Sequence, residues 1–139
     1  MREIEPGRLW IGNSGDLQDP ARWLPLNVEA VVELADSEPA AHLPRHLIHC
    51  RFPLADGGEN PDWLIRIAAQ TVADLIRDRI PTLVACAWGM SRSLVTVATG
   101  LALVRRSSIR QELLSLTATG PADVSPALVA QFQAVCERA

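Results

Sequence analysis

Cys86 and Arg92 are the two side chains whose types and spacing point most directly to chemistry, because five residues separate a nucleophile from an anion-binding group. A buried strand is predicted before Cys86 and a buried helix after Arg92. Backbone N–H groups of the loop between them can surround one tetrahedral oxyanion, and the helix N-terminus adds favourable partial charge. The guanidinium of Arg92 can bind two oxygens of that anion, and the same field favours the thiolate of Cys86. The residues predicted to bind phosphate are Ala87, Trp88, Gly89, Met90, Ser91 and Arg92, of which Gly89 lets the backbone curl inward without a side chain in the way.

A nucleophile inside a phosphate-binding loop predicts attack on phosphorus and a phosphocysteine intermediate, and this mechanism needs a general acid for the leaving oxygen. Asp56 lies in a glycine-containing polar loop after a predicted strand, 30 positions before Cys86. Loops that follow parallel strands open at one edge of an α/β sheet, where sites of this class lie. Asp62 is the alternative acid, but it falls in the first turn of a predicted helix, where a carboxylate complements the helix dipole. We therefore assign Asp56.

The rest of the chain alternates strands with helices, which predicts an α/β fold with a mostly parallel sheet and helices on both faces. Short apolar runs predict strands at 8–12, 28–34, 47–54 and 81–85. Apolar spacing and start signals predict helices at 20–23, 61–79, 94–104, 108–116 and 126–138. The start signals are Asp19-Pro20, Asn60-Pro61, a capping box of Ser108 with Gln111, and Ser125-Pro126, whereas Asn13-Ser14-Gly15 is predicted to be a turn.

The Cys-x5-Arg motif followed by Ser93 resembles the signature of the protein tyrosine phosphatase superfamily, most of all its compact dual-specificity branch. The likeness covers nearly the whole chain, from the strand at 9–12 through the strand at 31–34, the Asp56 loop and the motif to the terminal helices. It implies that Cys86 is the nucleophile, that Arg92 binds the phosphate, and that Asp56 protonates the leaving group and later activates water. It also implies that Ser93 donates a hydrogen bond to the departing sulfur. The resemblance thus predicts a phosphatase of phosphotyrosine and phosphoserine or phosphothreonine that needs neither a metal nor another cofactor.

Four residues around the motif bear on activity and substrate. The superfamily usually has a histidine that orders the loop before the cysteine, and Ala85 in its place predicts slower turnover. Ala87 and Met90 occupy positions that are often basic in relatives acting on inositol phospholipids, so lipid and polyphosphate substrates are disfavoured. Trp88 is bulky for a phosphate loop. Packing behind the loop and an aromatic wall for the leaving group are both open, and we favour packing.

Two other functions share these features. A phosphate-binding pseudophosphatase is favoured if Ala85 leaves the thiol inert. A rhodanese-like sulfurtransferase also uses a cysteine in an anion-binding loop, but it needs no acid and leaves Asp56 without a role.

The composition fits one domain over residues 1–139. With 48% hydrophobic and 21% charged residues, a disordered chain is excluded, and a net charge of -3 lacks the basic field that nucleic-acid binding requires. The N-terminus carries charges where a signal peptide needs an apolar stretch. The apolar run 94–104 is too short to span a bilayer. We expect a cytoplasmic protein that binds a phosphorylated protein or a small phosphomonoester but no nucleic acid or membrane. A monomer is compatible with the sequence.

The three cysteines, Cys50, Cys86 and Cys136, are too few for a disulfide framework and favour a reducing compartment. Cys50 and Cys136 are interpreted as small core residues, with a redox pairing of Cys50 and Cys86 left open.

No metal site is expected at His42, His46 and His49. Pro44 interrupts any helix through the first two histidines. His49 and Cys50 are neighbours on a predicted strand, so their side chains point to opposite faces.

Overall fold

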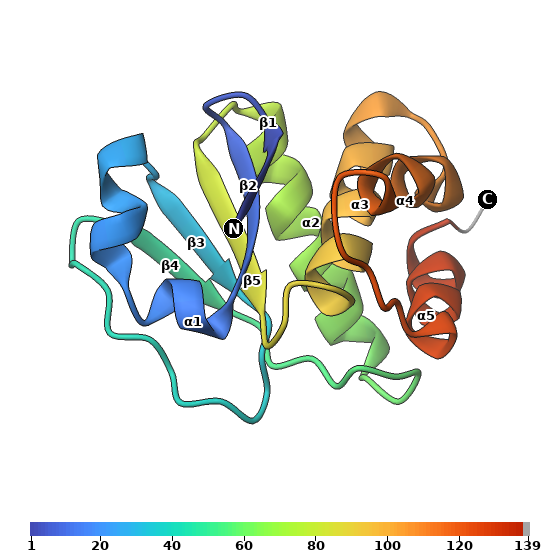
Figure 1. Ribbon diagram of the computed structural model, residues 1–139. Coiled ribbons are helices and arrows are strands. Elements are labelled where there is room, and N and C mark those ends of the chain that lie inside the picture. The colour runs from blue at the N-terminus through green and yellow to red at the C-terminus, as the bar shows by residue number, and fades with distance from the viewer. Residues whose placement is uncertain (138–139) are drawn as a thin grey trace.

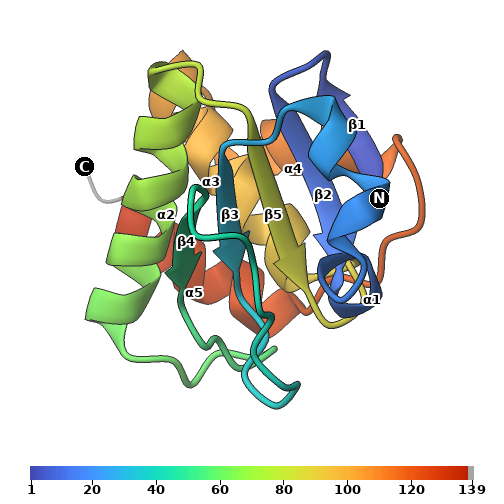
Figure 2. The same ribbon diagram turned by 90° about the vertical axis from the view of Figure 1, so that its left-hand side faces the viewer.

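The computed structural model describes residues 1–137, and its centre is one five-stranded sheet. The strands follow the order β1-β2-β5-β3-β4 across the sheet (Figure 2). All neighbouring pairs are parallel except β1 and β2, which are antiparallel. The predicted α/β fold with a mostly parallel sheet is confirmed. The strands are β1 (Arg2–Glu5), β2 (Leu9–Asn13), β3 (Ala30–Glu33), β4 (Ile48–Arg51) and β5 (Thr82–Cys86).

Helices cover both faces of the sheet, as predicted, but unequally (Figure 1). The larger layer consists of α2 (Asp62–Arg77), α3 (Arg92–Arg105), α4 (Ile109–Thr117) and α5 (Pro126–Cys136). The opposite face carries α1 (Ser14–Leu17) and two 3-10 turns, η1 (Pro20–Arg22) and η2 (Leu24–Leu26). Each layer buries its own apolar cluster against the sheet. Within residues 1–137, no helix is both long and apolar enough to cross a membrane.

Helix α3 lies in the middle of the larger layer and is apolar nearly all round. Its residues from Arg92 to Ala102 are all buried. Each fully buried leucine or valine contributes about 1.5–3 kcal/mol relative to an exposed one, so this helix is held firmly. Gly100 allows the approach of α2, because a Cβ there would lie 2.8 Å from Val72 Cγ1. The N-terminus of α3, where the predicted site begins, therefore has a fixed position relative to the sheet.

Several local predictions near the N-terminus are wrong. Residues 13–15 do not form a turn: Asn13 caps α1, accepting a hydrogen bond from Asp16 N while the Asp16 carboxylate accepts one from Asn13 N. Asp19 makes no side-chain cap, and the helix predicted at 20–23 is the short 3-10 turn η1. Strand β1 was not predicted. It is a four-residue edge strand without clear alternation of polar and apolar residues.

The later elements agree better with the sequence. The capping box of Ser108 and Gln111 and the cap of Ser125 are both present. Strands β3 and β4 are shorter than the predicted 28–34 and 47–54. Asn60 does not cap α2, because its side chain is used elsewhere, as described below. The predicted end of the last helix, Arg138, lies outside the described residues.

Candidate active site

The predicted site residues converge at the carboxyl edge of the sheet, where β5 ends at Cys86 and α3 begins at Arg92. A cavity of about 50 Å³ opens there. Cys86 and Arg92 are 2% and 7% exposed, so the thiol and the guanidinium are shielded from bulk water. The residues that line the cavity are Asp56, Cys86, Trp88, Met90, Ser91, Arg92 and Asp123.

Residues 86–92, called the cradle from here on, have the tight backbone that the sequence predicts. Gly89 adopts the left-handed conformation with φ of 70°, and a Cβ at this position would lie only 2.8 Å from Gly12 O. Its N–H donates a hydrogen bond to Cys86 Sγ at 3.3 Å. Ser14 N binds Ala87 O at 3.3 Å and so joins the cradle to the end of β2. Glycine is therefore required at position 89 by both conformation and space.

Arg92 is oriented by two acceptors on neighbouring loops. Its Nη1 donates to Asp36 Oδ1 and to Leu54 O, each at 2.8 Å. Within the described part of the chain this is the only guanidinium nitrogen of Arg92 with hydrogen-bond partners, so Nε and Nη2 are left for two oxygens of a phosphate. Asp36 was missed from the sequence. It follows the buried strand β3, and the rule that located Asp56 after its strand would have located Asp36 too.

Asp56 is held against the cradle by a short relay of hydrogen bonds. Its Oδ1 accepts from Ser91 Oγ at 2.6 Å, and Ser91 Oγ in turn accepts from Ser125 N at 3.1 Å. Asp62 does not line the cavity. It lies in the first turn of α2, where Oδ1 accepts from Gln131 Nε2 at 3.5 Å. Of the two candidate acids, the fold brings Asp56 to Cys86.

The segment 55–60, called the acid loop from here on, takes its shape from Asn60. The buried amide of Asn60 accepts from Ala55 N at 2.7 Å and donates to Ala55 O at 3.0 Å and Gly57 O at 3.1 Å. Gln131 on α5 hydrogen-bonds the Asn60 backbone. Nothing in the sequence signalled this role, because Asn60-Pro61 is typical of a helix start.

Ser93 lies fully buried in the first turn of α3. Its Oγ has no hydrogen-bond partner among residues 1–137, Cys86 Sγ included. Its expected bond to the departing sulfur thus stays a prediction for the reacting state. A buried hydroxyl without a partner costs free energy, so Ser93 is available to a group that forms during a reaction.

The packing interpretation of Trp88 is wrong, because the side chain is 77% exposed. At Gly89, the next residue, the cradle lies directly against Gly12. Trp88 and Met90 instead line both the small cavity and an adjoining one of about 230 Å³ next to β2 and Arg2. The indole is placed as a wall beside the cavity entrance.

Cys50 and Cys86 are too far apart for the disulfide that the sequence left open. Cys50 on β4 pairs with Val32 on β3, and Val32 pairs with Val84 on β5, so two strand spacings separate the cysteines. Two spacings amount to about 10 Å, beyond the roughly 7 Å between Cα atoms that a disulfide spans. Cys50 packs partly buried against the larger core, as predicted. Its burial raises the pKa of its thiol, and burial does the same for the pKa of Cys136.

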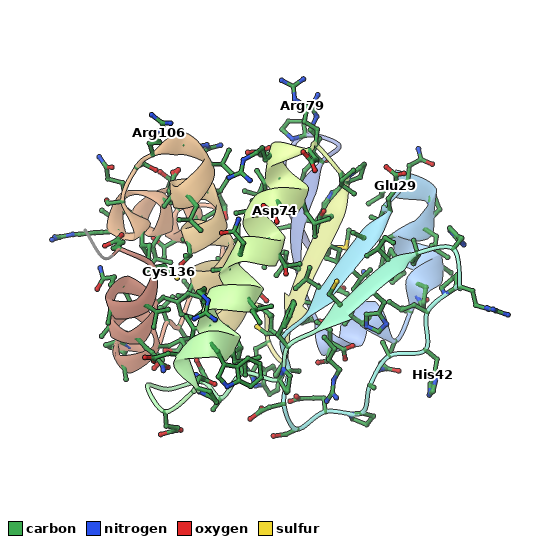
Figure 3. All side chains as sticks on the ribbon, turned by 180° about the vertical axis from the view of Figure 1, so that it is seen from behind. Glu29, His42, Asp74, Arg79, Arg106 and Cys136 are labelled. Atoms are coloured by element: carbon green, nitrogen blue, oxygen red, sulfur yellow. The ribbon has the colours of Figure 1, made fainter. Side chains whose placement is uncertain are left out.

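The histidines occupy unrelated places. His49 Nε2 lies 2.8 Å from the buried carboxylate of Glu33, on the sheet face opposite to Cys50. His42 is exposed on the loop between β3 and β4 (Figure 3). In the described part of the chain, no group of three or more His, Cys, Asp or Glu side chains could hold a metal ion.

The structure is similar over nearly its full length to solved structures of dual-specificity phosphatases and of a phosphatase-like protein. Human DUSP28 superposes with a TM-score of 0.83 at 19% identity, covering 99% of this chain and 96% of that one. DUSP15 gives 0.79 at 23% identity, covering 96% and 85%. The human tyrosine phosphatase-like serine/threonine/tyrosine-interacting protein gives 0.80 at 15% identity, covering 96% and 93%.

This chain has the dual-specificity phosphatase fold. The resemblance to dual-specificity phosphatases that the sequence predicted is confirmed for the fold. The antiparallel strand β1 was not part of that prediction. The sequence itself matches no family model. A search of curated proteins also found no match. Three-dimensional structure therefore carries the relationship to the dual-specificity phosphatase fold.

Proposed function

We propose that this protein is a cysteine-dependent phosphatase that hydrolyses phosphomonoesters of proteins through a phosphocysteine intermediate. The observation that carries the proposal is the convergence of Cys86, Arg92 and Asp56 on one small cavity at the junction of β5 and α3. A nucleophile, an anion-binding fork and an acid are the three groups that this reaction needs.

In the first step, the Cys86 thiolate attacks phosphorus and an S–P bond forms. The bond between phosphorus and the leaving oxygen breaks, and Asp56, protonated, gives its proton to that oxygen. The cradle N–H groups and Arg92 bind the equatorial oxygens, where negative charge increases. The short bond from Ser91 Oγ keeps the Asp56 carboxyl at the mouth of the cavity.

In the second step, the Asp56 carboxylate takes a proton from water as the water oxygen attacks phosphorus. The S–P bond breaks, its electron pair returns to sulfur, and inorganic phosphate leaves. Ser93 Oγ donates to the departing thiolate and gains the partner that it lacks in the resting structure.

The surroundings of the cavity favour monoesters with one phosphate. Asp123 lines the cavity with Asp56, and Asp36 pairs with Arg92, so the surroundings carry negative charge. The uncharged Ala87 and Met90 offer nothing to a second phosphate group. A cavity of about 50 Å³ admits a phosphoryl group from phosphotyrosine, phosphoserine or phosphothreonine. Trp88 then forms an aromatic wall beside the leaving group. We place this activity in the cytoplasm, where the free thiols stay reduced.

A phosphate-binding module without turnover is the second candidate, and the observation that favours it is Ala85. One structural neighbour is itself described as a tyrosine phosphatase-like, serine/threonine/tyrosine-interacting protein. A sulfurtransferase is the third, and it leaves the Asp56–Ser91 contact without a role.

Trapping the intermediate tests all three. Asp56→Asn protein, which is slow in the second step, is mixed with an activated aryl phosphate, quenched in acid and digested for mass spectrometry. Phosphate on Cys86 supports the phosphatase. Unmodified Cys86 with bound phosphate and no turnover by the wild type supports the binding module. A persulfide on Cys86 after incubation with thiosulfate supports the sulfurtransferase.

A further inference from the structure

Arg2 reaches the cradle from β1, 84 positions before Cys86. Its Nη2 donates to Gly89 O at 3.0 Å and also to Pro121 O. Its Nη1 donates to Thr119 Oγ1 at 3.3 Å. One side chain thus joins the first strand, the cradle and the loop between α4 and α5.

The peptide groups of Gly89 connect Arg2 to the nucleophile. The Gly89 carbonyl accepts from Arg2, while the Gly89 N–H donates to Cys86 Sγ. Glycine is the residue with the widest choice of backbone conformations, so an external contact matters more here than at any other cradle position. A charge-assisted bond is among the stronger hydrogen bonds available for that purpose.

An electrostatic interaction with Cys86 also acts on Arg2. Partial burial lowers the pKa of the Arg2 guanidinium, and the negative charge of the Cys86 thiolate opposes this by raising it. Ala85, the residue before the nucleophile, is fully buried between Gly12 and Glu33 of the neighbouring strands and has no polar group to order the loop.

We propose that Arg2 is the positioning residue of the cradle: it holds the Gly89 carbonyl so that the Gly89 N–H stays directed at Cys86 Sγ. The inference rests on the proposed function for the identity of the bound anion, but not for the geometry. Arg2 acts through Gly89 and touches neither the phosphate nor the leaving group.

The test compares Arg2→Ala with Arg8→Ala, which removes one exposed arginine from the same β1–β2 hairpin. Alkylation of Cys86 by iodoacetamide is followed against pH by peptide mass spectrometry. In Arg2→Ala we expect several-fold slower alkylation near neutral pH and a profile displaced to higher pH. Cys50 and Cys136 interfere little, because burial raises the pKa of each. Arg8→Ala is expected to match the wild type.

The other charged groups around Cys86 are the same in Arg2→Ala and Arg8→Ala, so a difference in alkylation between these two variants is due to Arg2. The charged side chains that line the cavity or bind its members are Arg92 on α3, Asp56 on the acid loop, Asp36 after β3 and Asp123 between α4 and α5.

Two further variants separate positioning from charge and from stability. Arg2→Lys keeps the charge but not the planar fork, and we expect kcat/KM for an aryl phosphate to stay about ten- to a hundredfold below wild type, since misplacing a reacting group by about 1 Å can cost 10²-fold. Thr119→Val removes the contact that Arg2 Nη1 makes outside the cradle, and should lower thermal stability without changing alkylation.

The proposal is overturned if Arg2→Ala, folded by circular dichroism, keeps the wild-type alkylation profile, or if Arg2→Lys turns over as fast as wild type. Alkylation requires no turnover, so it tests Arg2 even if no phosphate ester is hydrolysed. If Arg2→Ala shows the expected displacement of the alkylation profile but the wild-type protein hydrolyses no phosphate ester, the result contradicts the proposed phosphatase activity and supports the role of Arg2.

Discussion

The cradle and the acid loop contribute to the same cavity, but different forces hold them. The cradle is continuous with β5 and α3, two of the most buried elements of the fold, and Gly89 fits against Gly12 with no room for a Cβ. The acid loop follows the short, largely exposed strand β4, and side-chain hydrogen bonds of Asn60, Gln131 and Ser91 give it its position.

The difference corresponds to a division of labour. In the proposed mechanism, the groups that must match the phosphate within a fraction of an ångström lie on rigid elements, because catalytic geometry tolerates little error. The proposed proton donor, Asp56, lies on a loop, and it needs only to come within hydrogen-bond distance of a leaving oxygen whose position varies between substrates. Changes in the cradle should therefore affect all substrates alike, and changes in the acid loop should depend on the leaving group.

Removal of Cys86, the proposed nucleophile, should give the largest effect. Cys86→Ser should abolish hydrolysis of an aryl phosphate while phosphate binding, measured by calorimetry, persists, because the cradle N–H groups and Arg92 remain. Vanadate, which resembles the transition state, should inhibit the wild type competitively without added metal. Residual turnover by Cys86→Ser would contradict the mechanism.

Substitution of Asp56 in the acid loop should give the second largest loss of activity, and the size of the loss should depend on the leaving group. Asp56→Asn should slow alkyl and peptide phosphates by about 10²–10⁴-fold, since an alkoxide must be protonated as it leaves. An activated aryl phosphate, whose leaving group departs with less help, should lose much less. Steady-state rates on the two substrate types measure the ratio, and the variant should flatten the alkaline limb of the pH–rate profile.

Asp62→Asn is the matched control, since it changes an acid of the neighbouring helix that does not line the cavity. It should cost some helix stability, through the lost dipole interaction and a weaker contact with Gln131, and should leave the ratio of alkyl to aryl phosphate rates unchanged. A leaving-group-dependent loss in Asp62→Asn, with none in Asp56→Asn, would move the assignment to Asp62. If neither variant shows a leaving-group-dependent loss, the acid loop does not supply the acid, and the proposed difference between the cradle and the acid loop is wrong.

Arg92→Lys should lower kcat/KM about a hundredfold or more for aryl and alkyl phosphates alike, on the scale of losing one transition-state donor. Lysine keeps the charge but cannot donate to Asp36, Leu54 and two phosphate oxygens in one plane. Arg110→Lys, at an exposed position on α4, serves as control. Turnover by Arg92→Lys within about threefold of wild type would contradict the binding of two phosphate oxygens by the Arg92 guanidinium, since losing a transition-state donor costs far more.

Asn60→Ala gives the smallest effect and probes what holds the acid loop. It leaves the backbone groups of Ala55 without their partners, so the free energy of unfolding in urea should fall by about 1–3 kcal/mol. Turnover of alkyl phosphates should fall more than that of aryl phosphates, because Asp56 is held less well. Glu59→Ala, at the exposed neighbouring position, should show neither change. Equal losses on both substrates would show that the loop also shapes the cradle.

Elements with a strong local signal were predictable. Helix α2 has apolar residues at helical spacing, α3 is apolar all round, and Ser108 with Gln111 is a capping box that needs no distant partner. Where a polar residue has two uses, local signals failed. Asn13 was expected in a turn and caps α1, and Asn60 was expected to cap a helix and closes the acid loop. Propensity ranks both uses alike, and the tertiary surroundings choose between them.

By itself the sequence determined that Cys86 and Arg92 share one loop, since they are linked by five residues between a buried strand and a buried helix. It also placed Asp56 on a loop that opens at the same edge, because parallel strands present their carboxyl ends together. Only the tertiary structure decided that Asp36 orients Arg92, that Trp88 faces solvent and that Arg2 holds Gly89. These contacts join residues far apart in the chain, and their geometry depends on how the sheet and its helices pack, which no short-range pattern encodes.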